Sequence, residues 1–233
     1  MVSFGAGHSQ VGRTEVGWED VRITTGLTLE QLKEKGVRVG SVAVPARDFR
    51  GPTVFGDEKD PLIGACNYDN RMGCAFQLSI LHAMKENDLV PNCDWIFAFP
   101  KQEEVKGNGI KPLALREKPD VLIGIDGGPI FPGSDITWDG GCVVITKDKL
   151  ADYNFEVILA IQDAARAVGQ ELQYLTTDVA YTDASLAQQS GGPMRIGFFG
   201  FTADTAHGYE MIKYSMLKQY FDLFYSFVKT FNP

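Results

Sequence analysis

Two adjacent glutamates, Glu103 and Glu104, follow an apolar run at residues 95–99 that has the length and residue types of a buried strand. Neighbouring residues do not share one face of a strand or helix, so these two carboxylates can point at different targets. One of them could bind a metal ion while the other takes a proton from a water molecule that attacks a substrate. Paired glutamates are also common in solvated loops, so this interpretation depends on the residues that the fold brings beside them.

Further metal-ligating or acid–base side chains occur where other predicted strands end. Asp126 comes directly after the apolar run at residues 121–125, and His207 follows the run at residues 194–201. Asp69 lies just before the first long helical pattern. Each residue alone could cap a helix or form a turn. In open α/β sheets, however, ligands bind beyond the carboxyl ends of the strands, so this arrangement favours one shared site. Carboxylates and imidazole suit zinc, cobalt or manganese.

Helix and strand patterns alternate from Leu62 onward, and these elements must position the site. Helical spacing of apolar residues and helix-end signals predict helices at residues 73–86, 111–117, 153–168, 183–190 and 209–231. Short apolar runs predict strands at residues 95–99, 121–125, 142–146, 172–175 and 194–201. This alternation predicts an α/β fold with a mixed, mainly parallel sheet covered by helices.

The first part of the chain has a different composition, rich in Gly, Val and Thr. One short helix is well marked there, because Thr28 can cap it, Gln31 completes a capping box and Gly36 ends it. Turn-forming clusters follow at residues 50–53 and 56–61. We therefore expect a small β-rich domain at residues 1–58 and an α/β domain at residues 59–233.

The composition argues against several classes of partner. The chain has 233 residues and a formal net charge of −8, and its lysines and arginines form no cluster. This acidic balance disfavours nucleic acid or an anionic membrane as a partner. No apolar run approaches the length of a membrane span, and the first residues lack the pattern of a signal peptide. The four cysteines form no Cys-x-x-Cys pair, which favours reduced thiols in a cytoplasmic protein.

Short motifs around the predicted strand ends share their order and approximate spacing with a known family. They are Asp69-Asn-Arg-Met-Gly-Cys74, Gln102-Glu-Glu-Val105, Pro119-Asp-Val-Leu-Ile-Gly-Ile-Asp126, Thr182-Asp-Ala184 and His207-x-x-Glu210. In these motifs the chain resembles the M42 aminopeptidases, a family of di-metal peptidases. Its members include glutamyl and deblocking aminopeptidases and have often been mislabelled as cellulases or endoglucanases. The resemblance covers about residues 62–233, and residues 20–48 resemble the later part of that family's inserted β-rich domain.

The resemblance implies a role for each of the acidic residues and the histidine. Asp69 would bridge two divalent metals, either zinc, cobalt or manganese. Glu104 and His207 would complete the protein ligands of one metal, and Asp126 would bind the other. Glu103 would be the catalytic general base, taking a proton from the attacking water and passing it to the leaving amine.

Three further residues would support this site. Asn70 and Arg71 would orient the neighbouring aspartate and fix the start of the helix. Asp183 would support the site or bind the amino terminus of the substrate. The function implied is that of a metal-dependent aminopeptidase that removes N-terminal residues from peptides and assembles as a homo-oligomer through the inserted domain.

The chain departs from the family at one metal ligand. The family has an earlier His-x-Asp motif, which binds the second metal, whereas this chain has histidines only at positions 8, 82 and 207. His82 lies within a predicted helix, and His8 is the remaining candidate for this ligand. We therefore expect that the chain begins inside the inserted domain and lacks the family's first third. One metal would bind tightly and a second weakly or not at all, and the missing motif would leave the peptidase activity low or absent.

Two alternatives remain open at this point. The chain could be a non-catalytic relative that keeps the M42 fold and only binds or assembles, which the absent His-x-Asp motif favours. It could also be a di-metal deacylase that acts on a non-peptide amide. The presence of Glu103 favours an enzyme, because a structural protein has no need of a free base beside a metal site.

Overall fold

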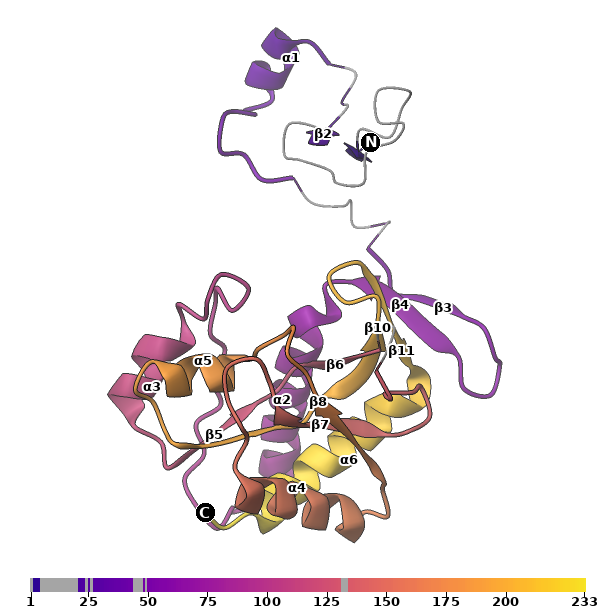
Figure 1. Ribbon diagram of the computed structural model, residues 1–233. Coiled ribbons are helices and arrows are strands. Elements are labelled where there is room, and N and C mark those ends of the chain that lie inside the picture. The colour runs from indigo at the N-terminus through magenta and orange to yellow at the C-terminus, as the bar shows by residue number, and fades with distance from the viewer. Residues whose placement is uncertain are drawn as a thin grey trace. The chain divides into compact units, whose positions relative to one another are not determined.

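The computed structural model describes residues 2–4, 21–23, 25, 27–43, 48, 50–130 and 134–233. The chain divides into two compact units, Met1–Pro45 and Ala46–Pro233 (Figure 1). No helix among the described residues is both long enough and apolar enough to cross a membrane. His8, the remaining candidate for an extra metal ligand, lies outside the described residues.

The first unit contains a strand pair and the predicted short helix. β1 (Val2–Phe4) pairs antiparallel with β2 (Val21–Ile23), and α1 (Leu29–Glu34) follows. The side chain of Thr28 accepts a hydrogen bond from the N–H of Gln31 at 3.3 Å, and Gln31 Oε1 accepts one from the N–H of Thr28 at 2.9 Å. The capping box predicted from the sequence is therefore formed.

The division between the units falls earlier than the boundary expected near residue 58. The reason is β3 (Thr53–Phe55), which pairs antiparallel with β4 (Leu62–Cys66) and so belongs to the second unit. The turn-forming residues between these two strands connect a hairpin instead of separating two domains.

The second unit is built on a mixed sheet. Its largest part is a five-stranded sheet with the strand order β3-β4-β11-β10-β6 (Figure 1). Two parallel strand pairs, β5-β9 and β7-β8, accompany this sheet. The strands after β4 are β5 (Val121–Gly124), β6 (Gly127–Ile130), β7 (Cys142–Lys147), β8 (Leu172–Thr176), β9 (Arg195–Phe198), β10 (Phe201–Asp204) and β11 (Tyr209–Lys213). The predicted mixed α/β fold is confirmed.

Hydrogen bonds around Gly200 connect the five-stranded sheet with the neighbouring strand pairs. Gly200 lies between β9 and β10 and exchanges hydrogen bonds with Val143 of β7, at 2.9 and 2.7 Å. On the opposite side, the N–H of Phe201 donates to the carbonyl of Asp126 at 3.3 Å. A Cβ atom at Gly200 would lie 2.5 Å from that carbonyl oxygen, so glycine permits this close approach. The predicted strand at residues 194–201 is thus two strands with a short break.

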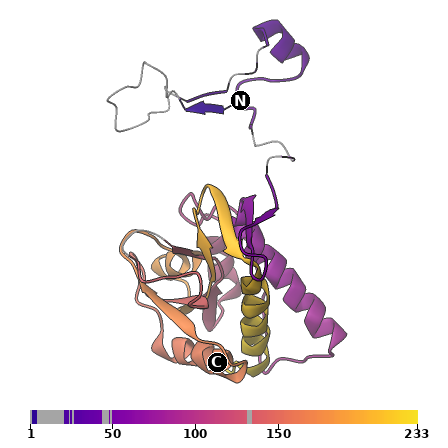
Figure 2. The same cartoon turned by 90° about the vertical axis from the view of Figure 1, so that its right-hand side faces the viewer.

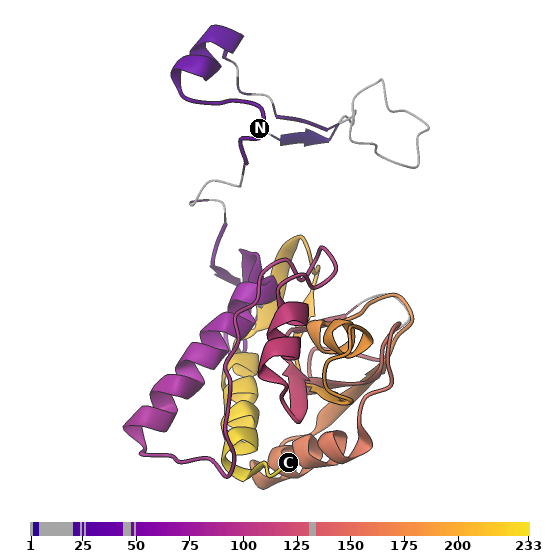
Figure 3. The ribbon, with the colours of Figure 1, turned by 90° about the vertical axis from the view of Figure 1, so that its left-hand side faces the viewer.

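Five helices accompany the strands of the second unit among the residues that the structure describes. They are α2 (Tyr68–Glu86), α3 (Ile110–Glu117), α4 (Phe155–Ala167), α5 (Asp183–Gln189) and α6 (Tyr214–Thr230). Helices α4 and α5 cover opposite faces of the β5-β9 pair, because a Cβ atom at Gly197 would meet Val157 of α4, whereas one at Gly124 would face Ala184 of α5. Helices α3 and α5 lie side by side (Figure 3).

The predicted helix at residues 209–231 begins later than expected. Its first five residues form β11, along which burial alternates so that Glu210 and Ile212 face the interior. This alternation has the period of a strand, and β11 pairs antiparallel with β4. The following α6 contributes the fully buried Tyr220, Phe224 and Phe227 to the main core.

The expected strand at residues 95–99 is wrong. Within the described part of the chain, these residues join no ladder. Trp95 and Phe97 instead pack on α6, with ring centroids 5.8 Å from Phe227 and 6.3 Å from Phe224, respectively. Ile96 remains exposed. The apolar composition of this run therefore reflects aromatic packing on one side and does not reflect strand pairing.

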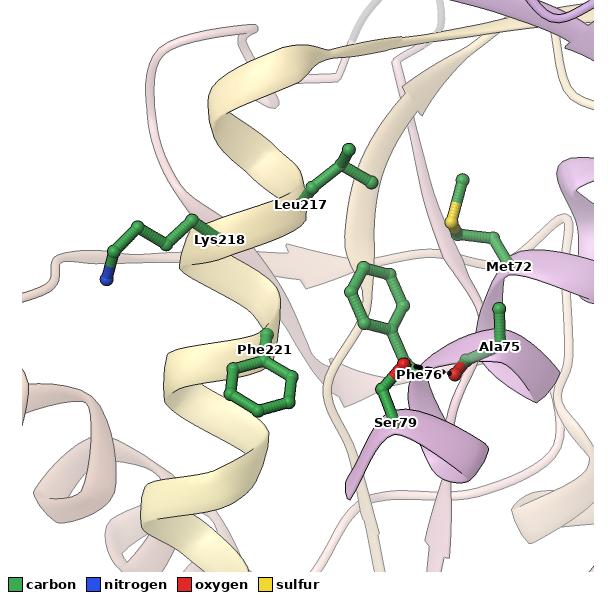
Figure 4. Close-up of a pocket in the computed structure, with 7 residues that line it drawn as sticks. All are labelled: Met72, Ala75, Phe76, Ser79, Leu217, Lys218 and Phe221. Carbon is green, nitrogen blue, oxygen red and sulfur yellow. Dashed lines mark hydrogen bonds between the residues drawn. The ribbon is translucent and has the colours of Figure 1, made fainter. Parts of the chain in front are cut away.

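A shallow apolar groove runs between α2 and α6, which lie side by side (Figures 2 and 3). Figure 4 shows Phe76 of α2 and Leu217 and Phe221 of α6 lining it. None of the residues that line this groove is one of the predicted metal ligands.

The first turn of α6 is capped by a distant carboxylate. Asp60 accepts hydrogen bonds from the N–H and the hydroxyl of Ser215, at 2.9 and 2.8 Å. Burial acts to raise the pKa of Asp60, but these hydrogen bonds and the charge of Lys213 outweigh it and lower the pKa below its ordinary value. Because the folded-state pKa is lowered, the stabilisation is present at neutral pH and is lost as the pH falls through that pKa.

We expect Asp60→Ala to lower the free energy of unfolding at neutral pH by about 0.5–2 kcal/mol, the range for loss of a helix cap. The matched control is Asp139→Ala, which removes the other carboxylate that pairs with Lys213 but leaves the helix cap intact. Urea unfolding of both variants at pH 7 and at pH 3 measures the difference. Equal stabilities of the two variants at pH 7 would contradict the capping role.

Candidate metal centre

Three side chains from separate segments meet in one cluster. His207 Nε2 lies 3.1 Å from Asp69 Oδ2 and 3.2 Å from Glu104 Oε1. One ligand atom from each residue lies within 4.8 Å of the others, and no second group of this kind occurs among the described residues. Two carboxylates and one imidazole are thus arranged as three ligands of a single ion could be.

Asp69 is held at the start of α2, where the backbone is not yet helical. Asp69 and Asn70 have non-helical dihedral angles, and the regular helix follows them. Asn70 Oδ1 accepts a hydrogen bond from the N–H of Gly73 at 3.0 Å, which caps this helix. A Cβ atom at Gly73 would lie 2.2 Å from Asn70 Oδ1, so the cap requires glycine there. The Asn70 amide also donates to the carbonyl of Ile125 at 2.6 Å.

That last hydrogen bond brings the end of β5 beside the start of α2. Asp126 follows Ile125, and its Oδ1 accepts a hydrogen bond from the N–H of Gly127 at 2.7 Å. Burial, together with the charge of Asp69, raises the pKa of Asp126 well above its ordinary value. Asp126 lies outside the cluster of three ligand atoms, but it interacts electrostatically with it.

The two glutamates lie in the loop that precedes α3. Glu104 is largely exposed and reaches His207, whereas Glu103 is half-buried. Burial and the charges of Asp183 and Glu104 raise the pKa of Glu103 to about 7. The adjacent carboxylates therefore have different surroundings, as expected from their positions in the sequence.

His207 lies in the loop between β10 and β11. Its backbone has a φ of 65°, and the neighbouring turn is closed by a hydrogen bond from the N–H of Gly208 to the carbonyl of Thr205 at 2.9 Å. Its side chain is 67% exposed, so a ligand could approach it from solvent. His82, by contrast, is exposed in the middle of α2 and lies outside the cluster.

The two remaining predicted residues differ in their surroundings. Arg71 donates to the main-chain carbonyls of Asn67, at 3.0 Å, and Cys66, and so braces the chain just before Asp69. Asp183 begins α5, and its Oδ1 is buried without a hydrogen-bond partner among the described residues. Burial raises the pKa of Asp183 to about 6, against the opposing charge of Lys111.

Glu210, for which the sequence pattern predicts no role, is connected to the cluster in the structure. Its carboxylate is buried and accepts hydrogen bonds from the main-chain N–H groups of Asp69 and His207. The signal available in the sequence was the His207-x-x-Glu210 spacing, but a glutamate in a predicted surface helix would not be expected to turn inward.

The donor set fits a divalent metal ion. Burial and the charge of Glu104 raise the pKa of Asp69, and the pKa values of Asp126 and Glu103 are raised by burial and the surrounding carboxylates as well. A cation bound among them would offset this repulsion. Two carboxylates and an imidazole match the ligand preferences of zinc, cobalt and manganese.

Solved structures of other proteins share this fold. The chain is similar in fold to the aminopeptidase APDkam598 from the archaeon Desulfurococcus kamchatkensis, with a TM-score of 0.80, 20% identity, and coverage of 96% of this chain and 63% of that one. It is also similar to the TET1 peptidase of Pyrococcus horikoshii, with a TM-score of 0.68, 21% identity, and coverage of 77% and 53%.

The chain thus spans little more than half the length of the Pyrococcus structure and less than two thirds of the Desulfurococcus one. No curated protein sequence gives a significant match. The model of the M42 glutamyl aminopeptidase family matches residues 6–223, which is most of the sequence. The chain therefore belongs to the M42 glutamyl aminopeptidase family.

Proposed function

We propose that this protein is a metal-dependent aminopeptidase that removes N-terminal residues from peptides. The observation that carries the proposal is the convergence of Asp69, Glu104 and His207 on one point, beside the half-buried carboxylate of Glu103. Membership of the M42 family supports the same reaction class.

Asp69, Glu104 and His207 would hold one divalent ion, and Asp69 with Asp126 would hold a second, weaker one. When bound, such an ion polarises a substrate carbonyl and lowers the pKa of a coordinated water. Zinc, cobalt and manganese suit these ligands. The second pair lacks an imidazole, so we expect it to bind zinc less tightly.

Glu103 would act as the general base. Its carboxylate is half-buried, and burial and the neighbouring negative charges favour its uptake of a proton. It would accept a proton from the attacking water and return it to the amine that leaves. Asn70 and Arg71 would keep the aspartate ligand in place through their hydrogen bonds to the main chain.

Asp183 would bind the free ammonium group of the substrate's first residue. Its Oδ1 is buried without a partner among the described residues, and its charge contributes to the raised pKa of Glu103. A buried carboxylate oxygen that lacks a donor is available to an ammonium group.

Asp183→Asn is therefore expected to raise the KM for aminoacyl substrates by about 10-fold or more, the loss expected for a hydrogen bond to a charged group. The matched control is Asp178→Asn, an exposed position on the loop before α5. Steady-state kinetics of both variants measure the change. An unchanged KM in Asp183→Asn would contradict contact with the substrate's ammonium group.

We further propose that the protein is a homo-oligomer. The Pyrococcus horikoshii TET1 peptidase, to which the chain is similar in fold, can assemble into a tetrahedron or a large octahedral shell. In the first unit, Leu29, Val39 and Val42 are exposed apolar side chains that a second copy could cover. Light scattering after size-exclusion chromatography tests this directly.

Hydrolysis of a substrate panel tests the proposed reaction. The protein would be stripped with a chelator, reloaded with zinc, cobalt or manganese, and given aminoacyl anilides and their N-acetylated counterparts. An aminopeptidase hydrolyses the free aminoacyl compounds and needs the metal. Preference for the N-acetylated compounds would indicate a deacylase, and tight metal binding without any hydrolysis would indicate a non-catalytic relative.

A further inference from the structure

Glu210 is a buried glutamate whose carboxylate accepts two main-chain N–H groups. The residue is only 2% exposed. Its Oε2 accepts a hydrogen bond from the N–H of Asp69 at 3.0 Å, and its Oε1 accepts one from the N–H of His207 at 3.1 Å. Both donors therefore belong to residues whose side chains form the candidate metal centre.

The sheet explains how one carboxylate reaches both segments. Glu210 lies on β11 opposite Ala65 of β4. β4 ends at Cys66, shortly before Asp69, and β11 begins directly after the loop that carries His207. Pairing of these two strands thus brings the two loops to the same edge of the sheet, with the inward-facing carboxylate between them.

Asp148 shows how an ordinary structural carboxylate differs from this one. It is 1% exposed, and its Oδ1 accepts hydrogen bonds from the N–H groups of Leu150 and Ala151, at 2.7 and 2.9 Å. Both of these main-chain donors lie in the same local turn, and Oδ2 accepts a hydrogen bond from the hydroxyl of Tyr153 at 3.0 Å. None of these donors belongs to a candidate metal ligand. The two donors of Glu210 come from segments far apart in the sequence, and each carries a candidate ligand.

The backbone at both donors lies outside regular secondary structure, so no helix or sheet ladder fixes it. Asp69 has non-helical dihedral angles inside the first turn of α2, and His207 has a positive φ. Hydrogen bonds to an ionised carboxylate are stronger than those between neutral groups. The main-chain positions of these two residues determine whether Asp69 Oδ2 and His207 Nε2 can lie 3.1 Å apart.

We propose that Glu210 is a positioning residue that holds Asp69 and His207 in register, so that the affinity for a divalent metal ion depends on it. Glu210 itself does not ligate the ion. This role rests on the proposed metal centre, and it concerns how the ligands are positioned before any ion binds. Groups that orient metal ligands in this way typically contribute about 10–100-fold to metal affinity.

The test compares Glu210→Gln with Asp148→Asn in the full chain. Glutamine keeps the shape of the side chain but replaces one acceptor oxygen with a donor that faces an N–H group. Asp148→Asn makes the same chemical change at a buried carboxylate whose main-chain donors are not candidate ligands. For each metal-free variant, thermal unfolding is recorded, followed by the zinc dissociation constant from calorimetry and the visible absorption spectrum with cobalt.

Glu210→Gln is expected to bind zinc about 10–100-fold more weakly than the parent and to give an altered cobalt spectrum. Asp148→Asn is expected to retain the parental zinc affinity and cobalt spectrum, even where its melting temperature falls by as much as that of Glu210→Gln. If the parent binds zinc and Glu210→Gln binds it equally well with the same spectrum, the positioning role is wrong while the metal centre stands. If the parent binds no divalent ion, the proposed function and this role both fail.

A second measurement applies if Glu210→Gln does not fold. Hydrogen exchange in the metal-free parent, resolved by residue, reports whether the N–H groups of Asp69 and His207 are protected. Protection of both supports the proposal, because the carboxylate of Glu210 is the acceptor for each. Exchange of both at the rate of an unstructured peptide would overturn it.

Discussion

A Glu103→Gln variant is expected to retain its fold and its bound metal but to hydrolyse aminoacyl substrates about 10²–10⁴-fold more slowly, the contribution typical of a general base. Glutamine has nearly the same shape as glutamate, but it cannot accept the proton of the attacking water. Glu103 also lies outside the group of ligand atoms formed by Asp69, Glu104 and His207, so its replacement leaves those ligands in place. The fall should appear in kcat.

Glu117→Gln provides the matched control for this variant. Glu117 is exposed at the end of α3, in the segment that follows the Glu103 loop, and its partner is Arg116. It should keep the parental kcat and metal content. A Glu103→Gln enzyme that retains most of its activity would show that another group accepts the proton.

A His207→Ala variant is expected to lose more than about 100-fold in metal affinity. This loss is larger than that for groups that only orient ligands, because the substitution removes a ligand itself. His207 Nε2 is the one nitrogen donor of the cluster and lies close to both carboxylates. Without it, two carboxylates remain, which form a weaker site for zinc. Titration of the metal-free protein with zinc measures the loss.

His82→Ala is the matched control for the histidine variant, because His82 is exposed on α2 and lies outside the cluster. It should bind zinc as the parent does. Equal zinc affinity in the two histidine variants would remove His207 from the ligand set. His8 would then become the first residue to replace.

Much of this arrangement could be predicted from the sequence, because the relevant signals are local. The side chain of Asp126 follows an apolar strand, and the parallel pairing of that strand with β9 could be expected from the alternation of elements. The capping box at Thr28 is equally local, since its partners lie three residues apart. Such patterns depend on neighbouring residues and therefore remain visible without the fold.

The features that could not be predicted from the sequence depend on contacts between segments that lie far apart along the chain. The apolar run at residues 95–99 has the composition of a strand, but its rings pack on α6 and no neighbouring strand pairs with it among the described residues. The five residues of β11 are continuous with the apolar stripe of α6, so the sequence pattern predicts that the helix begins there. The pairing of β11 with β4 is a contact between segments that lie far apart in the sequence.

The inward orientation of Glu210 follows from the same missed strand. In a helix this residue would be one exposed glutamate among several polar residues. On β11 its side chain faces the interior and reaches two main-chain N–H groups. A buried charged residue of this kind can be interpreted only once its partners are known.

The proposed binding of a divalent ion by Asp69, Glu104 and His207 can be tested directly. Crystals of the zinc-loaded protein, measured on both sides of the zinc absorption edge, would locate the ion directly. We predict the strongest anomalous peak at about 2.0–2.2 Å from one carboxylate oxygen of Asp69, one of Glu104, and Nε2 of His207. A second, weaker peak is expected between Asp69 and Asp126. A strong zinc peak elsewhere in the molecule, with none at these three side chains, would contradict the account.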